Sequence, residues 1–153
     1  MNLIIRQACD DDLPQVLALY AQPGLDDGQV LELDKAREIL AEFARYPNYR
    51  LFVAVSDAAP EKVLGSYALL VMHNLAHRGT PSAIVEDVVV DVSCRSQGIG
   101  RQMMEHAKAE AREAGCYKLA LSSNRRRERA HAFYESLGFE LHGYSFVIDP
   151  QSK

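Results

Sequence analysis

The chain of 153 residues lacks the cysteine patterns that mark disulfide-rich and zinc-binding proteins. Its three cysteines, Cys9, Cys94 and Cys116, are odd in number and widely spaced. They form neither a disulfide framework nor a C-x-x-C ligand pair, so we expect three reduced thiols. His73 and His77 lie close together in the sequence, but no third ligand can be assigned to them. No metal site is predicted.

Long apolar runs and excess basic charge are also missing. No segment is long and apolar enough to cross a membrane, and the first residues do not resemble a signal peptide. We therefore expect a soluble, cytoplasmic protein with no membrane association. The formal net charge is -4, whereas nucleic-acid-binding domains are generally basic. The arginine-rich run 125–129 is short and has no interleaved aromatic residues, so no nucleic-acid partner is predicted.

The sequence has no internal repeat, low-complexity tract or Pro/Gly/Ser-rich linker that would divide it. Hydrophobic residues make up 48% and charged residues 25%, a composition typical of globular proteins. A chain of this length can bury a core without disulfides or metals. We predict a single domain over residues 1–153.

Apolar periodicity and turn residues predict the element order βααβββαβαβ(β). The fold class is α/β, with a single mixed, mostly antiparallel central sheet of six to seven strands flanked by about four helices. The expected strands cover residues 2–8, 51–55, 63–72, 83–92, 117–122 and 144–148. The expected helices begin near residue 12, at 34, near 100 and at 129.

The segment 88–101 carries the clearest chemical signal. A valine-rich strand ends, a turn with Gly98 and Gly100 follows, and an amphipathic helix begins within that turn. Glycines allow consecutive backbone N–H groups to point into one concavity, and a helix N-terminus adds positive partial charge. Arg95 and Arg101 can add full charges. These features predict a cradle for a pyrophosphate group.

A glycine pair spaced G-x-G occurs in several kinds of turn, and by itself it is compatible with a tight turn that merely precedes a helix. A dinucleotide-binding turn needs a third glycine, but residue 103 is methionine, and the loop comes late in the chain. A P-loop needs Gly-Lys-Ser/Thr, which does not follow. The pattern that remains is R-x-x-G-x-G between a strand and a helix.

This pattern resembles the acyl-CoA-binding signature of the GNAT superfamily of N-acetyltransferases. A second motif, Asn124 together with AHAFYESLGF at 130–139, is similar to the family's A-x-x-F-Y-x-x-x-G-F helix. The resemblance extends from the first strand to Tyr144. It implies the acyl-CoA N-acyltransferase fold, and an enzyme that transfers an acetyl group from acetyl-CoA, as co-substrate, to a primary amine. It also implies direct attack within a ternary complex, with a small molecule as the acceptor.

The resemblance also implies which residues bind the acetyl donor. The backbone of the strand end would pair with the pantetheine arm, and the region of Val90 would hold the thioester carbonyl. The loop and the first helical turn would hold the pyrophosphate. The cofactor-binding residues expected in this way are Val88, Val89, Val90, Arg95, Ser96, Gln97, Gly98, Ile99, Gly100, Arg101, Asn124 and Phe133.

Acetyl transfer to an amine needs a proton acceptor for the amine and a proton donor for the leaving thiolate. Tyr134 lies where the family commonly places the acid, and the acid is preferred to the alternative of a core tyrosine on a helix face. Glu86 is preferred as the base or as the residue that positions a water, with Asp87 as the alternative. Strand alternation would point these two carboxylates to opposite faces. Either could instead be a plain surface charge.

Two other functions remain open: a catalytically inactive CoA-binding sensor module, and a peptide or protein N-acetyltransferase. Retention of both Tyr134 and Glu86 argues against a module that only binds. The stretch 49–146 resembles aminoalkylphosphonate N-acetyltransferases, and the Glu86-Asp87 pair resembles glucosamine-phosphate N-acetyltransferases, without naming a substrate. A homodimer supported by the strand expected at 144–148 is a further expectation.

Overall fold

The computed structural model describes residues 2–152, which form two compact units, one ending at Leu121 and the other beginning at Ser122. The first unit contains a five-stranded sheet and three α-helices, and the second contains one α-helix. The strands are β1 (Leu3–Gln7), β2 (Tyr49–Ser56), β3 (Ala59–Met72), β4 (Ser82–Val90) and β5 (Leu119–Ala120). The helices are α1 (Leu13–Tyr20), α2 (Leu33–Phe43), α3 (Ile99–Glu113) and α4 (Glu128–Ser136).

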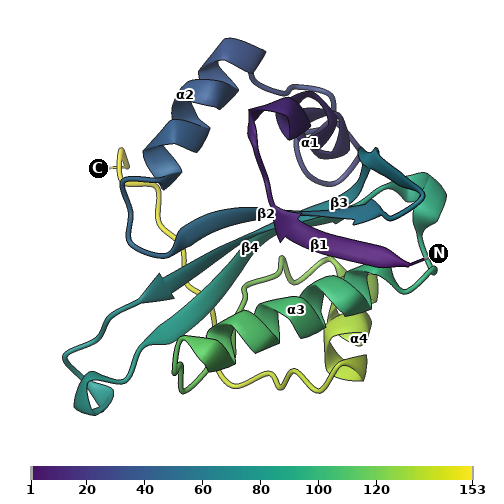
Figure 1. Cartoon of the computed structure of the whole chain (residues 1–153). Coiled ribbons are helices and arrows are strands. Elements are labelled where there is room, and N and C mark those ends of the chain that lie inside the picture. The colour runs from purple at the N-terminus through teal and green to yellow at the C-terminus, as the bar shows by residue number, and fades with distance from the viewer. Residues whose placement is uncertain (1, 153) are drawn as a thin grey trace. The chain divides into compact units, whose positions relative to one another are not determined.

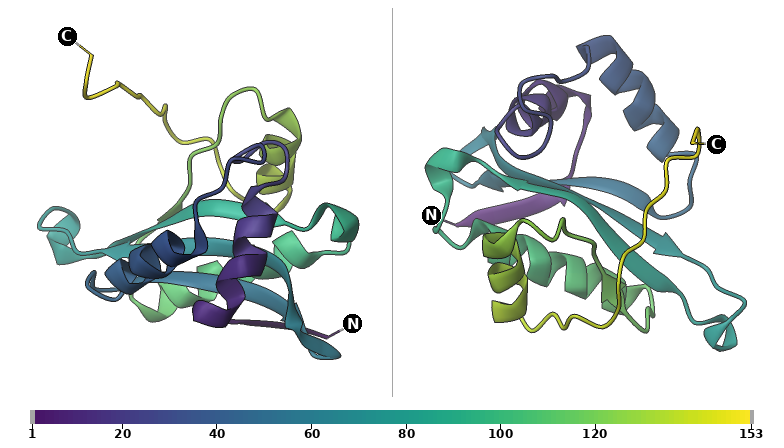
Figure 2. Two further views of the ribbon diagram at one scale, coloured as in Figure 1. Left: turned by 90° about the horizontal axis from the view of Figure 1, so that it is seen from above. Right: turned by 180° about the vertical axis from the view of Figure 1, so that it is seen from behind.

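The sheet of the first unit is mixed and follows the chain order β1-β2-β3-β4-β5. The first four strands are antiparallel neighbours, whereas β5 runs parallel to β4. Helices α1 and α2 lie on one face of the sheet and α3 on the other, as Figure 1 and the right-hand view of Figure 2 show. These are called the α1 face and the α3 face below. The predicted mixed α/β class is confirmed.

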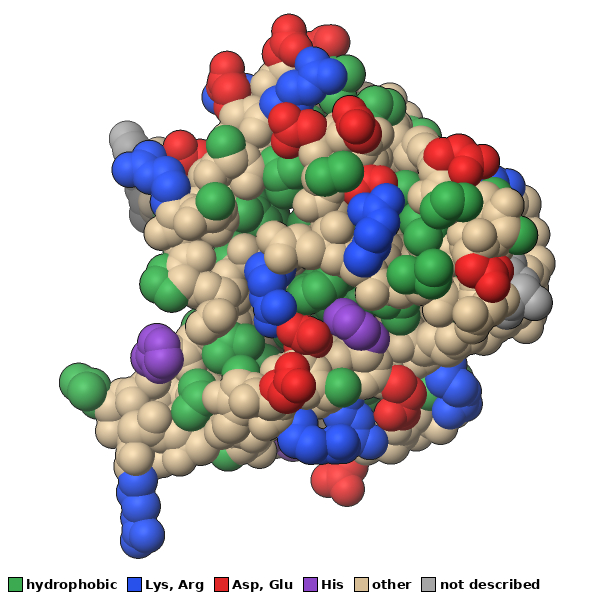
Figure 3. All heavy atoms as spheres, in the orientation of Figure 1, with side chains coloured by type: hydrophobic (Ala, Val, Ile, Leu, Met, Phe, Trp, Pro, Cys, Tyr) green, Lys and Arg blue, Asp and Glu red, His purple; other side chains and the backbone are tan. Residues whose placement is uncertain are grey.

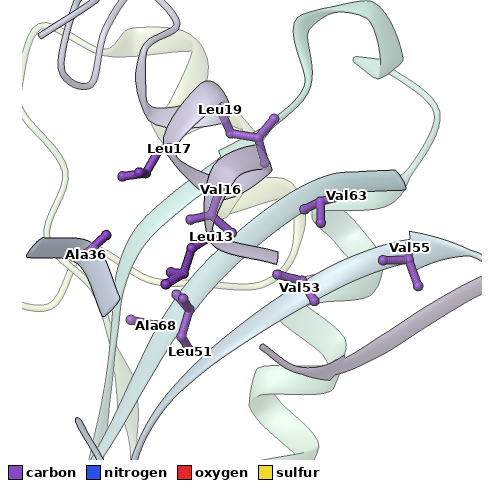
Figure 4. Packing of buried hydrophobic residues seen from close by; sticks show 10 residues of the cluster. All are labelled: Leu13, Val16, Leu17, Leu19, Ala36, Leu51, Val53, Val55, Val63 and Ala68. Carbon is purple, nitrogen blue, oxygen red and sulfur yellow. The ribbon is translucent and has the colours of Figure 1, made fainter. Parts of the chain in front are cut away.

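The core on the α1 face forms where the apolar side of a helix packs against alternate residues of a strand. Leu13, Val16 and Leu17 recur at helical spacing on α1, and alternate residues of β2 point toward them (Figure 4). All of these side chains are at most 8% exposed. Burial of several such side chains, each contributing about 1.5–3 kcal/mol, holds α1 against the sheet. The members of this cluster on the sheet are Leu51, Val53, Val55, Val63 and Ala68.

On the α3 face, buried residues of α3 at helical spacing face the sheet: Met103, Met104, Ala107 and Ala111. Helix α3 and strand β3 approach each other closely at Gly65. A Cβ at this glycine would lie 2.8 Å from the Met103 sulfur and 3.1 Å from the Val89 carbonyl oxygen. Gly65 is therefore required for the close contact between β3 and the start of α3.

Gly65→Ala is expected to lower the free energy of unfolding by about 1–3 kcal/mol, the usual cost of overpacking a core. The Met103 side chain can move, but the Val89 carbonyl belongs to β4 and cannot shift without disturbing the strand. Urea unfolding monitored by circular dichroism would measure the change. Gly143→Ala is the matched control, because nothing lies within 4 Å of a Cβ placed there. Equal unfolding midpoints for the two variants would contradict the packing argument.

Polar side chains also join α3 to the sheet. The Arg50 Nη2 atom lies 2.6 Å from Glu110 Oε2, and Tyr67 Oη lies 2.7 Å from His106 Nδ1. Figure 3 shows basic, acidic and histidine side chains next to one another in the middle of this view of the molecule. Because Tyr67 is fully buried, this hydrogen bond satisfies a hydroxyl that would otherwise be unpaired. These contacts hold α3 in register with β2 and β3.

The prediction of six to seven strands is wrong, because the described residues form five. The segment 144–148, expected as the last strand, has strand-like composition but pairs with no other backbone in residues 2–152. A strand forms only where its N–H and C=O groups find partners. Tyr144, Phe146 and Val147 are accordingly 85%, 91% and 97% exposed. Figure 2 draws the chain after α4 without a strand.

Candidate acyl-donor and acceptor site

The strand β4 has an unpaired outer edge over its second half. Its parallel partner β5 reaches only Ala83 and Ile84, through the pairs Ala83–Leu119 and Ile84–Ala120. On the opposite edge, β4 is paired with β3 as far as Val90. Within the described residues, the outer edge from 85 to 90 therefore has no neighbouring strand. An extended ligand with amide groups can bind to such an edge as an added strand.

The backbone groups of Val90 point toward this open edge. The Asp91 N–H donates to the Leu64 carbonyl of β3 at 2.9 Å, and neighbouring residues of an antiparallel strand direct their groups to opposite sides. In agreement, the Val90 carbonyl accepts a hydrogen bond from Gln22 Nε2 at 3.2 Å. The Val90 N–H therefore points away from β3 and is free to bind a ligand. The Val88 groups point in the same direction by alternation.

The loop that follows β4 leads directly into α3. Asp91 closes its first turn by accepting the Ser93 N–H at 2.8 Å. Ser96 and Gly98 have positive φ values of 65° and 79°, and these turn the chain into the helix. Gln102 is the first residue of α3 whose N–H donates a helical hydrogen bond, and its acceptor is the Gly98 carbonyl. The N–H groups of residues 98–101 have no acceptor among the described residues, as is usual at a helix start.

This loop fits a diphosphate group. Nothing lies within 4 Å of a Cβ placed at Gly98, so the space beside the free N–H groups is open. Arg95 and Arg101 are exposed, and in residues 2–152 neither forms an ion pair. Ile99 differs from its neighbours, because its side chain is 1% exposed and packs into the core. Only its backbone can contribute to anion binding.

The alternation of β4 is interrupted by a β-bulge at Asp87. Ala68 is paired with Glu86 and Ser66 with Val89, so Tyr67 alone lies opposite both Asp87 and Val88. Asp87 has a φ of 53°, in the left-handed region, which an aspartate tolerates better than most side chains. The extra residue shifts the pleat of the strand by one position.

The bulge overturns the expectation that Glu86 and Asp87 face opposite sides of the sheet. Glu86 lies across from Ala68, which belongs to the α1-face core, so Glu86 is on that face. The charge of Asp87 raises the pKa of Tyr20 and of Tyr49, and both rings pack against the same core. Side chains alternate between the two faces only in a regular strand, and β4 is not regular at Asp87, whose backbone is in the left-handed region. Both carboxylates are therefore available on the α1 face.

The electrostatics of this face favour protonated groups. Desolvation raises the pKa of Glu86, and the neighbouring charge of Asp87 raises it further. Desolvation also raises the pKa of Asp87, with a contribution from the charge of Asp26. Burial and then the charge of Asp87 raise the pKa of Tyr20 to about 12. Stronger bases have higher pKa values, so the shift of Glu86 is in the direction that a proton acceptor needs.

The second unit contains the remaining predicted residues. Asn124 lies in the turn before α4, where its Oδ1 accepts the Arg126 N–H at 3.0 Å. Its carbonyl oxygen lies 2.9 Å from His131 Nε2. The Asn124 side chain thus shapes this turn and keeps its Nδ2 group for another acceptor.

Tyr134 lies on α4 beside two aromatic rings, at centroid distances of 5.2 Å from Phe133 and 5.7 Å from Phe139. Burial raises the pKa of its hydroxyl, and the positive charge of Arg127 opposes the shift. The net direction keeps the phenol neutral and able to donate a proton at neutral pH.

Three residues near the site are not predicted from the sequence. Gln22 and Asp26 lie in the loop after α1, where the sequence indicates only a helix break, and the apolar spacing of α1 assigns Tyr20 to the core. The polarity of the two loop residues gives no periodic signal that would distinguish them from ordinary loop residues.

In residues 2–152, no cluster of three or more His, Cys, Asp or Glu side chains is placed to hold a metal ion. No described helix has both the length and the apolar character of a membrane span.

Known proteins resemble this chain over most of its length. Residues 13–139 match the Acetyltransferase (GNAT) family. An aminoalkylphosphonate N-acetyltransferase of Salmonella typhimurium is 30% identical over 143 residues, covering 94% of this chain and 88% of that one. A glucosamine 6-phosphate N-acetyltransferase of Trypanosoma brucei brucei is 34% identical over 88 residues, which are 58% of each chain. The solved structure of a Trypanosoma brucei acetyltransferase has a TM-score of 0.82 at 26% identity, covering 97% of this chain and 99% of that one.

The family match includes β4, the glycine turn and α3. The chain belongs to the acetyltransferase (GNAT) family, and it is an acyltransferase.

Proposed function

We propose that this protein transfers an acetyl group from acetyl-CoA to the primary amine of a small molecule. The observation that carries the proposal is the free N–H row of residues 98–101, which continues from the open edge of β4. In this arrangement the diphosphate of the donor binds the N–H row, with Arg95 and Arg101 as counter-charges. The pantetheine arm pairs with the backbone of Val90, the residue of the open edge that lies nearer to the diphosphate.

Acetyl-CoA supplies the acetyl group as a thioester, and the protein moves two protons. Glu86 takes a proton from the amine, directly or through a water, as the bond from nitrogen to the carbonyl carbon forms. The Val88 N–H, which points to the same open edge one step farther from the diphosphate, donates to the carbonyl oxygen as negative charge develops on it. Tyr134 gives its proton to the sulfur as the carbon–sulfur bond breaks, so that the thiolate leaves as a neutral thiol.

Thiol release from acetyl-CoA in the presence of amine panels tests this proposal. The panel contains amino-sugar phosphates and aminoalkylphosphonates, because relatives with those names match this chain. It also contains polyamines, amino acids and arylalkylamines. Turnover with one class would support the proposal and name the acceptor. Acetyl-CoA binding without any turnover would favour a protein acceptor or a binding-only module, and absence of binding would overturn the proposal.

The assignment of the base is tested by comparing Glu86→Gln with Asp87→Asn. Glu86→Gln is expected to lower kcat about 100-fold, the low end of general-base effects, because water can still accept the proton. Asp87→Asn removes the charge that raises the pKa of Glu86. It should therefore shift the acid limb of the kcat profile to lower pH while leaving the plateau within about threefold, since the base itself remains. The reverse ranking of the two variants would assign the base to Asp87.

A further inference from the structure

A buried hydrogen bond joins the sheet to the helix that begins at the proposed diphosphate cradle. Tyr67 Oη lies 2.7 Å from His106 Nδ1, and Tyr67 is fully buried. Phe52 stacks on the Tyr67 ring and meets the His106 ring edge-on, at centroid distances of 5.2 Å and 5.0 Å. Burial raises the pKa of the Tyr67 phenol, and desolvation lowers the pKa of His106. At neutral pH the protonated hydroxyl can therefore donate to a neutral imidazole.

One end of this bond lies on β3 where its neighbour β4 is irregular. Tyr67 is the single residue opposite both Asp87 and Val88. In the proposed function the Val88 N–H binds the thioester carbonyl. The residue that carries the buried hydroxyl is therefore the β3 residue opposite the carbonyl-binding residue of β4.

The other end lies on α3, which runs along the α3 face of the sheet (Figure 1). His106 comes about two turns after Ile99, the first residue of α3, which is about 10 Å along the helix axis. A helix is stiff over this length, so a contact that fixes His106 also fixes the free N–H row at the start of the helix. The bond thus connects the two places that hold the proposed donor, the diphosphate cradle and the carbonyl-binding strand.

Other contacts of α3 define its position along the axis less sharply. The buried side chains of α3 that face the sheet are flexible methionines and small alanines. The ion pair between Arg50 Nη2 and Glu110 Oε2 is directional, but it joins two long side chains that are 29% and 21% exposed. The Tyr67 hydroxyl, in contrast, is on a residue that water does not reach.

We propose that Tyr67 and His106 are positioning residues that set the spacing between the diphosphate cradle and the Val88 N–H. In the proposed function, on which this inference rests, the pantetheine arm pairs with Val90 as an added strand. An extended arm has little slack, so the donor reaches both points only when α3 and β4 keep their relative position. Tyr67 and His106 act through the backbone that they hold, without contacting the donor.

Calorimetry with two ligands tests this role. ADP carries a diphosphate without the pantetheine arm, whereas acetyl-CoA spans the cradle and the Val88 N–H. Tyr67→Phe removes the hydroxyl and keeps the ring that stacks on Phe52. It is expected to raise the Kd for acetyl-CoA about three- to tenfold, as for the loss of one hydrogen bond, and to leave the Kd for ADP within about twofold.

Two further variants serve as controls. In His106→Asn, the asparagine Oδ1 can replace the Nδ1 atom as acceptor, because both atoms are bonded to Cγ. The ratio of the Kd for ADP to the Kd for acetyl-CoA should then stay within about twofold of the wild type. Arg6→Met breaks the 2.7 Å ion pair of Arg6 with Asp12. It should lower the thermal stability without changing this ratio, because the pair lies outside the proposed site.

A general loosening of the protein would raise both Kd values of Tyr67→Phe by the same factor, and that result would overturn the inference. An unchanged Kd for acetyl-CoA would also overturn it, as would a His106→Asn variant with the same loss as Tyr67→Phe. A wild type that binds ADP and acetyl-CoA with equal Kd, or binds neither, is a different failure. It would overturn the donor site of the proposed function, and the inference with it.

Discussion

Tyr134→Phe is expected to lower kcat by about 100-fold or more, within the range that general acid catalysis contributes. The substitution removes one hydroxyl and leaves the ring that packs against Phe133 and Phe139. The affinity for acetyl-CoA should therefore change by less than about twofold, since the proposed pyrophosphate and pantetheine contacts are untouched. Single-turnover kinetics and calorimetry separate the two quantities.

The pH profile gives a second readout of the same role. An acid must be protonated to act, and burial raises the pKa of Tyr134 above its ordinary value. Wild-type kcat should therefore persist to a higher pH than the pKa of an unperturbed tyrosine would allow before it falls, and this alkaline limb should be absent from Tyr134→Phe. Tyr144→Phe is the control, because Tyr144 lies in the same unit and is 85% exposed. A Tyr134→Phe enzyme as fast as this control would exclude Tyr134 as the acid.

Gly98→Val is expected to raise the Kd for CoA by about 10- to 100-fold, which corresponds to the loss of one or two hydrogen bonds to a charged group. Gly98 has a φ of 79°, which a β-branched residue rarely adopts, and nothing lies within 4 Å of a Cβ placed there. Valine would either displace the loop or fill the space that the diphosphate needs. Isothermal titration with CoA measures the effect directly.

Gly115→Val supplies the control for backbone strain. Gly115 follows the other end of α3, has a φ of 74°, and also has nothing within 4 Å of a Cβ. Both variants should lose similar thermal stability, because both place a branched side chain in the left-handed region. Only Gly98→Val should lose CoA affinity. Equal CoA affinity in the two variants would remove the cradle from the proposed site.

Much of the architecture could be predicted from local patterns. The valine-rich strand and the glycine turn mark β4 and the start of α3, because alternation, left-handed turns and helix caps depend on neighbouring residues. The segment 144–148 shows the limit of such reasoning. Its composition is typical of a strand, but a strand also needs a partner, and no local pattern reports on that.

The site was only partly predictable, for a similar reason. The bulge at Asp87 depends on the pairing of β4 with β3, and an aspartate within a run of apolar residues gives no sign of it. The bonds of Gln22 join residues 68 and 70 positions apart. Interactions over such separations are set by the fold as a whole, so Gln22 and Asp26 could not be connected to the strand beforehand.

The bulge has a consequence for how this strand tolerates insertion and deletion. A pleated strand has a repeat of two residues, and Asp87 acts as a phase shift of half a repeat. Deleting this one residue would restore a regular ladder in which Glu86, Val88 and Val89 keep their positions opposite Ala68, Tyr67 and Ser66, and therefore keep their faces. The α1 face and the open edge of β4 would thus keep the same other residues without the bulge, so what the bulge adds to this strand is the Asp87 carboxylate itself.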